Sequence, residues 1–375
     1  MNKLIYMDYN ATSPIRPAVI DIVSKTMAEV GNPSSVHAAG RKARSIIEEA
    51  RAKVAALTGA RPRDIMFCSG GTEAGNTVIK GSGAKSLIVS AVEHDCVMAP
   101  AKAAEAAGLP VFKLPVDESG TVSLEALRNL LKTAPAPALV VVMYANNEMG
   151  AVQPIAAISE IAKEFGALVY SDAVQAAGKL PIDVMALGTN YLTLSAHKIG
   201  GPQGVGAIVL SPTAPLLPHI IGGGQELGRR SGTENVAGIA GFGEAAIEAL
   251  AQLGDAERLK HFRDRLEDEL RQHANDLVVI GEGAKRLVNT SCIAIPGVKG
   301  ETQVMHFDLA SICVSSGAAC SSGKVKISHV LEAMGYDASI ANSSIRVSLG
   351  YGTNEADIDA FISAWKKLYD RTAGR

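Results

Sequence analysis

Charge imbalance, long apolar runs and evenly paired cysteines are all lacking in this sequence. Its 375 residues hold 36 Lys and Arg against 38 Asp and Glu, with no basic tract, which disfavours a surface for nucleic acids or other polyanions. The longest apolar stretches, such as Ala138 to Met143, are only strand-length, so we expect no membrane span. The first eight residues hold no apolar core after Lys3, so we expect no export signal.

The cysteine count gives further exclusions. Five cysteines are an odd number in a long chain, which argues against a disulfide scaffold and favours a reducing cytoplasm. A structural zinc site is not expected, because the last two cysteines have no companion CxxC pair, and we predict no metal site. The five are Cys68, Cys96, Cys292, Cys313 and Cys320.

What the sequence does contain is a globular α/β pattern. Hydrophobic residues make up 47% of the chain and there are 37 Gly, and a chain of this length usually divides into more than one core. Helical periodicity alternates with short apolar runs that lack strict polar alternation, which predicts a mostly parallel sheet covered by helices on both faces. The seven runs are Ile65 to Phe67, Leu87 to Val89, Val111 to Leu114, Leu139 to Tyr144, Ala167 to Tyr170, Tyr191 to Leu194 and Ala207 to Leu210.

The pattern changes after Asn235. A long helical stretch and a charged helix are followed by four strand-like runs and a last helix near Asp357 to Tyr369, which predicts a small α+β domain at the C-terminal end. We therefore predict a large domain over 15–255 and a small domain formed by 1–14 and 256–375. The four runs are Leu277 to Ile280, Ser291 to Ile295, Ile312 to Ser315 and Ile345 to Ser348.

Three motifs follow predicted strands, where ligands of such sheets bind. Gly70-Gly71-Thr72 opens a helix after one strand, an arrangement suited to a phosphate, although it is not a GxGxxG or GxxxxGK[ST] nucleotide pattern. Asp172 follows another strand and needs a partner for its charge, and Lys198 precedes Gly-Gly-Pro, where a lysine can form a Schiff base. The alternatives are a glycine turn with a helix cap, a capping carboxylate and a solvated surface lysine.

A phosphate site, a carboxylate for a pyridinium nitrogen and a lysine for a Schiff base are the three handles that pyridoxal 5′-phosphate requires. With them, the sequence resembles the class V, fold-type I pyridoxal-phosphate enzymes, and among them the cysteine desulfurases of the NifS/IscS type. The resemblance runs from the N-terminal motif to about Gly350. Its motifs are Tyr6 to Thr12, Gly31 to Ser35, Ser195 to Lys198, Gly223 to Glu226 with Arg230 to Thr233, Ser315 to Cys320, and Ser343 to Arg346.

The resemblance implies a role for each matching residue. Lys198 would bind the cofactor aldehyde, Asp172 would keep the pyridine nitrogen protonated, and His94 would stack on the ring and move a proton. Asn147 and Gln175 would contact the phenolic oxygen. The phosphate would be bound by Gly71, Thr72, Ser195 and His197, with Thr233 reaching in from the neighbouring subunit of a homodimer.

The resemblance also implies a substrate pocket. Arg346 would fork onto the substrate α-carboxylate, a task suited to a guanidinium, and Asn32 and Asn147 would line the same pocket. Each assignment has an ordinary alternative: His94 and His197 as satisfied buried histidines, Arg346 as a surface residue beside a strand, and Asn147 as a turn residue.

Cys320 decides the reaction that we expect. It stands among tiny residues from Ser315 to Gly323, a context that indicates a mobile thiolate nucleophile, whereas the alternative is one more buried, inert cysteine. We therefore expect a cysteine desulfurase that converts L-cysteine into L-alanine and a Cys320 persulfide, which passes to acceptors for iron-sulfur clusters or other sulfur-containing cofactors. The alternatives are a selenocysteine lyase, another class V enzyme such as an aminotransferase, and a sulfur-relay docking partner with little turnover of its own.

Overall fold

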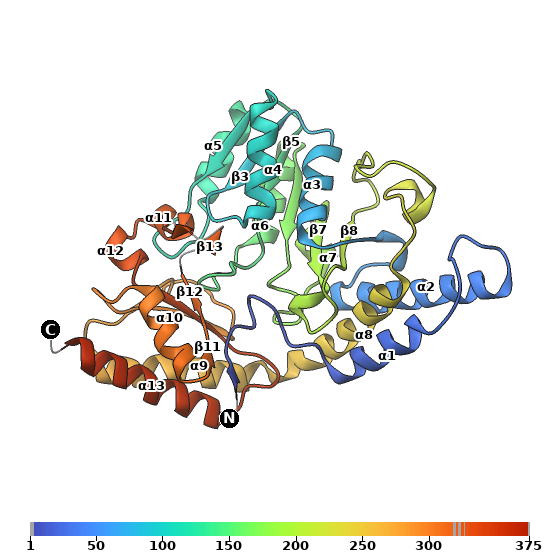
Figure 1. Ribbon diagram of the computed structural model, residues 1–375. Coiled ribbons are helices and arrows are strands. Elements are labelled where there is room, and N and C mark those ends of the chain that lie inside the picture. Colours follow the sequence, from blue (N-terminus) through green and yellow to red (C-terminus); the bar gives the residue numbers. More distant parts are fainter. Residues whose placement is uncertain (1–3, 318–319, 322–323, 326, 374–375) are drawn as a thin grey trace.

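A seven-stranded sheet organises the larger part of the molecule (Figure 1). The structure is a computed structural model that describes residues 4–317, 320–321, 324–325 and 327–373. The strands lie in the order β2-β8-β7-β6-β5-β3-β4, and β8 runs antiparallel to both of its neighbours while the other six are parallel to one another. Their bounds are β2 Ile65–Cys68, β3 Ser86–Ser90, β4 Val111–Leu114, β5 Ala138–Val141, β6 Leu168–Asp172, β7 Tyr191–Ser195 and β8 Gly206–Leu210.

All seven predicted apolar runs are strands of this one sheet, which confirms the α/β class with a mostly parallel sheet. The predicted run from Leu139 to Tyr144 is longer than the strand itself, because β5 ends at Val141. The chain nevertheless stays beside β6 beyond that point, since the Val142 and Tyr144 N–H groups donate to Tyr170 and Asp172 carbonyls at 3.1 and 2.8 Å.

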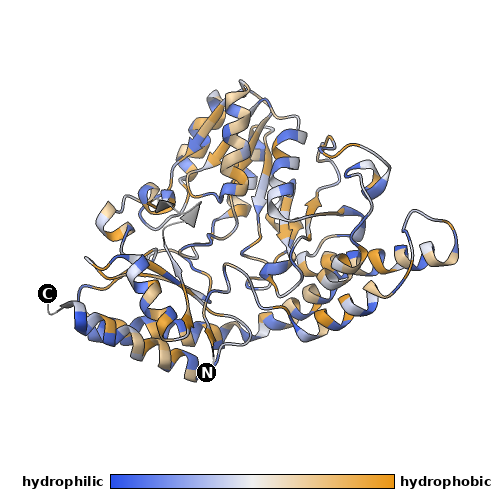
Figure 2. Ribbon diagram, viewed as in Figure 1, coloured by the Kyte–Doolittle hydropathy of each residue, from blue (hydrophilic) through white to orange (hydrophobic). Residues whose placement is uncertain are grey.

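Helices cover both faces of the sheet, and each face has its own core. In β5, Leu139 and Val141 point to the core below α3 and α4, whereas Val140 points to the opposite core. Figure 2 shows the hydrophobic colour along the central strands and on the inner sides of the helices. One face carries α3 Gly71–Gly81 and α4 Asp95–Ala106; the other carries α1 Pro17–Met27, α2 Ala38–Thr58, α5 Leu124–Thr133, α6 Ile155–Glu164 and α8 Val236–Gln252.

Helix α8 is unusually rich in glycine because it packs closely on α1 and α2. A Cβ atom on Gly243 would lie 2.7 Å from the Ala50 Cα, and one on Gly241 would lie 2.5 Å from the Val23 side chain. The stretch Val236–His273, α8 with α9, is long and apolar enough to pass for a membrane span, which corrects the expectation that every apolar stretch is strand-length. Half of its apolar window is buried, and Phe242 lies fully inside the core, so the contacts of α8 are those of a core helix.

The C-terminal part contains a four-stranded antiparallel sheet in the order β12-β15-β10-β9. The N-terminal strand β1 Ile5–Tyr6 joins this part by pairing in parallel with β11 Ile312–Cys313. The short turn Leu253–Asp255 lies near the predicted domain boundary, which stays a prediction. The further bounds are β9 Val278–Val279, β10 Thr290–Ala294, β12 Ser315–Ser316, β13 Cys320–Ser321, β14 Lys324–Val325, β15 Ser344–Ser348, α7 Val184–Leu187, α9 Ala256–His273, α10 Gly300–Leu309, α11 His329–Ala333, α12 Ala338–Ala341 and α13 Glu355–Ala373.

The close contact of α8 with α2 predicts a specific loss of stability. We expect Gly243→Ala to lower the free energy of unfolding by about 1–3 kcal/mol, because the added methyl group meets the α2 backbone. Urea denaturation measures this change. Gly254→Ala is the matched control, since a Cβ atom there has open space around it. Equal stability of the two variants would contradict the packing described here.

Candidate active site

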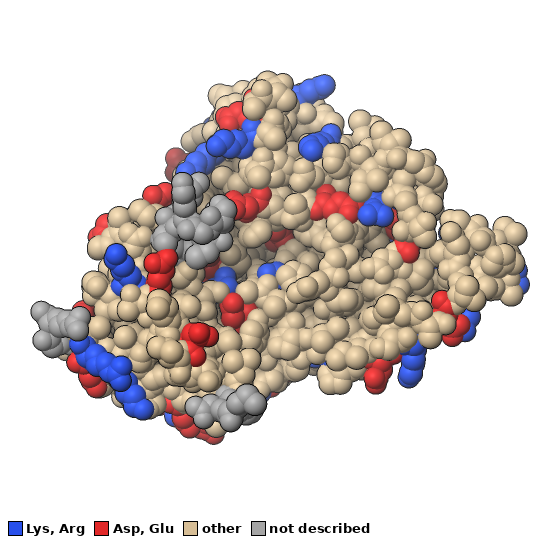
Figure 3. Space-filling model, viewed as in Figure 1, with Lys and Arg blue, Asp and Glu red and all other residues tan. Residues whose placement is uncertain are grey.

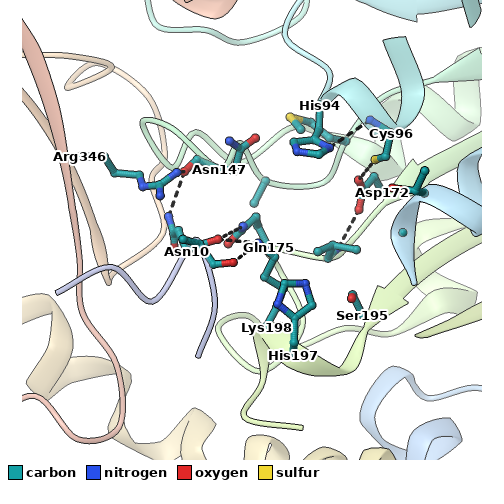
Figure 4. A pocket seen from close by; sticks show the side chains of 16 residues that line it. Asn10, His94, Cys96, Asn147, Asp172, Gln175, Ser195, His197, Lys198 and Arg346 are labelled. Atoms are coloured by element: carbon teal, nitrogen blue, oxygen red, sulfur yellow. Dashed lines mark hydrogen bonds between the residues drawn. The ribbon is translucent and has the colours of Figure 1, made fainter. Parts of the chain in front are cut away.

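A cavity of about 420 Å³ opens at the carboxyl ends of the parallel strands and brings together ten of the thirteen predicted site residues. Figure 3 shows this face hollowed near its centre, with charged side chains of both signs around the hollow, and Figure 4 shows the labelled side chains converging on it. The ten residues are Gly71, Thr72, His94, Asn147, Asp172, Gln175, Ser195, His197, Lys198 and Arg346.

One end of the cavity is suited to an anion. Strand β2 ends at Cys68, the chain turns at Gly70 with φ of 146°, and α3 begins at Gly71. The turn can lie against β8 only because position 206 is also glycine, where a Cβ atom would come within 2.6 Å of the Gly70 Cα. Gly71 and Thr72, in the first turn of α3, line the same side of the cavity as Ser195 and His197, and the first N–H groups of a helix have no partner within it. The predicted phosphate residues therefore lie together.

Asp172 is the last residue of β6 and is only 5% exposed. Its carboxylate accepts hydrogen bonds from two uncharged donors, the Val174 N–H at 2.9 Å and the Cys96 thiol at 3.4 Å. Burial raises the pKa of Asp172, while these hydrogen bonds and the nearby His94 and Lys198 lower it. A buried carboxylate with uncharged donors is well placed for a cationic partner in the cavity.

Lys198 lies just beyond β7, in a short turn spanning Ala196–Lys198. Its amine donates to the carbonyl oxygens of Asn10 and Ala11, at 2.7 and 2.8 Å. Burial and then the positive charge of Arg346 lower the pKa of Lys198 to about 8, although Asp172 acts in the opposite direction. The lysine is thus largely enclosed and partly deprotonated near neutral pH, unlike an ordinary surface lysine.

His94 precedes α4 and caps it, because its Nδ1 atom accepts a hydrogen bond from the Cys96 N–H at 3.1 Å. A neutral imidazole whose Nδ1 accepts carries its proton on Nε2. Loss of surrounding water in the cavity lowers the pKa of His94, and the charge of Lys198 lowers it further, whereas Asp172 raises it. His197 directly precedes Lys198 in the chain, and its pKa is lowered to about 4, chiefly by burial.

Arg346 reaches the cavity from β15, a strand of the C-terminal part. Its guanidinium donates to the Asn147 carbonyl at 3.1 Å, to the Asp8 carboxylate at 2.7 Å and to the Ser315 hydroxyl at 3.0 Å. Its buried Nε atom has no hydrogen-bond partner within the part of the chain that is described. Arg346 is therefore a cavity residue with donor capacity left, and the alternative of an ordinary surface arginine is excluded.

Three predicted residues do not line the cavity. Asn32 is exposed, and its side-chain oxygen accepts from the Ser34 N–H at 2.9 Å, so it closes a local turn before α2. Thr233 is exposed and lines a neighbouring hollow with Ser69. The backbone of Cys320 pairs in β13 with Val325 in β14, but its side chain lies outside the described residues, so the prediction for its thiol stays untested.

The structure adds cavity residues to which the sequence assigned no role. Asn10 is 1% exposed, and its carbonyl accepts from both Lys198 and Gln175. It stands in the N-terminal motif, but only the fold shows that this segment runs beside the cavity. Cys96 is two residues beyond His94, and this short spacing is the one sequence signal that could have indicated its place.

The four cysteines with described side chains are free and hold their protons. Burial raises the pKa of Cys68 and of Cys292 to about 12, and it also raises that of Cys96, where the carboxylate of Asp172 adds to the effect. The pKa of Cys313 is raised as well. Because the thiolate is the reactive form, these four side chains are poor nucleophiles.

Comparison with known proteins assigns the chain to a family. The model of the family "Aminotransferase class-V" matches residues 5–361. The cysteine desulfurase IscS of Dictyoglomus turgidum is 39% identical over 99% of this chain and 96% of its own length. A cysteine desulfurase of Cereibacter sphaeroides is 42% identical over 98% of this chain and 96% of its own length.

Solved structures agree with these relatives. The X-ray structure of a NifS-like protein from Rickettsia africae has a TM-score of 0.90 and 38% identity, covering 98% of this chain and 100% of that one. Both the family model and these relatives span nearly the whole sequence, including every residue of the cavity. The chain therefore belongs to the class V aminotransferase family and, within it, to the cysteine desulfurases of the NifS and IscS type.

Proposed function

We propose that this protein removes sulfur from L-cysteine with the help of pyridoxal 5′-phosphate, releasing L-alanine and leaving a persulfide on Cys320. The observation that carries the proposal is one cavity in which an amine, a buried carboxylate, an imidazole and a guanidinium converge, namely Lys198, Asp172, His94 and Arg346. The relatives that are named cysteine desulfurases support the same activity.

The residues of the cavity fit the cofactor. Donors suited to its phosphate line one end, with Thr72, Ser195 and His197 beside the start of α3. The carboxylate of Asp172, held by uncharged donors, is available for a protonated ring nitrogen. The amine of Lys198 lines the same cavity, whose volume of about 420 Å³ is within the usual range for small-molecule sites.

Pyridoxal 5′-phosphate, when bound, supplies a covalent attachment for the substrate amine and accepts the electron pair released at the α-carbon. Arg346 would bind the substrate carboxylate, because this guanidinium lines the cavity beside the Asn147 carbonyl. Lys198, with a pKa lowered to about 8, can take the α-proton as a neutral amine. His94, neutral with its proton on Nε2, can pass a proton to the product.

The transfer of sulfur from L-cysteine to Cys320 requires no added oxidant. The Cys320 thiolate would attack the substrate sulfur, so that an S–S bond forms as the C–S bond breaks and its electron pair stays with the carbon skeleton. Protonation of that skeleton gives L-alanine, and a second thiol can then take the sulfur from the persulfide. Cys320 remains as the candidate nucleophile, because raised pKa values keep the other four thiols protonated.

We infer that the active unit is a homodimer in which Thr233 completes the phosphate site of the neighbouring subunit. Thr233 is exposed in the single chain. The segment that carries it also exposes large apolar side chains, with Ile221 85% and Leu227 72% exposed. Such side chains are typical of a surface that another chain covers. The free thiols and the odd cysteine count support a reducing cytoplasm as the place of action.

The acidity of Lys198 can be measured in the cofactor-free protein. We expect the peptide that bears Lys198 to react with an amine-acylating reagent with a midpoint near pH 8, because a lowered pKa exposes the neutral amine at lower pH. In Arg346→Gln the midpoint should rise, since the positive charge of Arg346 lowers this pKa. Mass spectrometry at a series of pH values measures both. A midpoint near the ordinary 10.5 in both proteins would refute the described environment.

The persulfide is the decisive test of the reaction. After treatment with L-cysteine, we expect one added sulfur on the Cys320 peptide and release of L-alanine, both lost in Cys320→Ala. Cys313→Ala is the matched control and should keep both, because Cys313 lies outside the cavity. Full activity of Cys320→Ala on L-cysteine would favour a selenocysteine lyase or another class V enzyme. No release of L-alanine, even with a reductant that takes up the sulfur, would favour a sulfur-relay partner.

Mixed dimers test the role of Thr233. Lys198→Ala and Thr233→Ala proteins, each of low activity, should regain activity when they are unfolded together and refolded. If Thr233 acts on the neighbouring site, each mixed dimer contains one site with both wild-type residues. Alanine release measures the recovery. No recovery in mixed dimers shown to form would mean that Thr233 serves its own chain or no site.

A further inference from the structure

Lys179 contacts two residues of the active-site cavity, Gln175 and Asn10, without lining that cavity itself. It lies four residues after Gln175 and is half-buried, and it lines a small cavity of about 30 Å³ that also borders Lys198. Its amine donates two hydrogen bonds, to the Gln175 Oε1 atom at 2.6 Å and to the Asn10 Oδ1 atom at 3.0 Å. Neither the sequence motifs nor the proposed reaction assigns this lysine a role.

The Gln175 side chain is held at both ends of its amide. Its Nε2 atom donates to the Asn10 carbonyl at 2.9 Å, while its Oε1 atom accepts from Lys179. An amide nitrogen carries two hydrogens, so one remains for the main cavity, which Gln175 lines. A lysine amine has hydrogens to donate in either protonation state. The contact from Lys179 therefore fixes the position of Gln175 Oε1 and, because the amide is rigid, also that of Gln175 Nε2.

The loss of Lys179 would fall mainly on Gln175. Asn10 Oδ1 accepts a second hydrogen bond, from Asn289 Nδ2 at 3.2 Å, and so keeps a donor. Within the described part of the chain, Gln175 Oε1 has Lys179 as its donor and no other. Gln175 is 5% exposed, and a buried carbonyl without a donor is unfavourable. The amide would therefore lose the contact that fixes its orientation.

We propose that Lys179 is a positioning residue, which holds the Gln175 amide so that its nitrogen donates to the phenolic oxygen of the bound cofactor. The inference rests on the proposed function, because that function supplies the cofactor. A donor at this oxygen stabilises its anionic form, so the orientation of one amide sets the pH at which the cofactor chromophore titrates.

The test is a pH titration of the absorbance of the cofactor-loaded enzyme. Lys179→Met keeps the length of the side chain and removes the donor, and we expect the titration midpoint to rise by about half to one pH unit. Lys179→Arg, which keeps the donors, should stay near the wild type. Lys53→Met is the matched control: it removes an amine on α2 that pairs with Glu244 of α8, and should leave the midpoint unchanged.

A double-mutant cycle shows whether Lys179 acts through Gln175. In a Gln175→Ala background, Lys179→Met should shift the midpoint no further. An equal shift in both backgrounds would overturn the inference, since Lys179 would then act by its charge. An unchanged midpoint with lowered thermal stability would also overturn it, since Lys179 would then contribute only to the stability of the fold. If Lys179→Met does not fold, Lys179→Gln, too short for both contacts, should show the same rise, and an unchanged midpoint there would overturn it.

The two proposals fail in different ways. If the wild-type protein shows no cofactor absorbance and releases no L-alanine, the proposed function is wrong and the role of Lys179 falls with it. If the wild type shows both and Lys179→Met titrates like the wild type, the proposed function stands and the role of Lys179 alone is wrong.

Discussion

Two hydrogen bonds from Lys198 connect the end of the large sheet to the N-terminal segment at the active site. The amine reaches the carbonyl oxygens of Asn10 and Ala11, which belong to a segment whose first strand pairs with the C-terminal part of the chain. The same amine stands at the end of a strand of the large sheet. One side chain thus links the end of the large sheet to the N-terminal segment, which is itself paired through β1 with the C-terminal part.

The charges around this point oppose one another. Arg346 and burial favour the neutral amine of Lys198, whereas Asp172 favours its charged form. The positive charges of His94 and Lys198 in turn lower the pKa of Asp172. Between groups that are largely buried such effects are strong, so the protonation of each group depends on its neighbours. This coupling suits an enzyme that must take a proton from one atom and return it to another.

Small residues let the site form. Gly70 and Gly206 allow the turn before α3 to lie against β8, which brings the start of that helix to the cavity. Farther away, the glycines of α8 allow it to pack against α1 and α2 and so support the sheet from one side. The precise placement of polar groups at the strand ends depends on these close backbone contacts.

The sequence alone determined the seven strands, the helices between them and the motifs at the strand ends, because these depend on local periodicity and on glycine turns. Of the thirteen site residues proposed from the sequence, the cavity contains ten. The tertiary structure decided which residues from distant segments contact one another. Asn10 contacts Lys198 across 188 residues of sequence, and Lys179 reaches the same Asn10. No local pattern encodes such contacts, since they arise only when the N-terminal segment folds back across the end of the sheet.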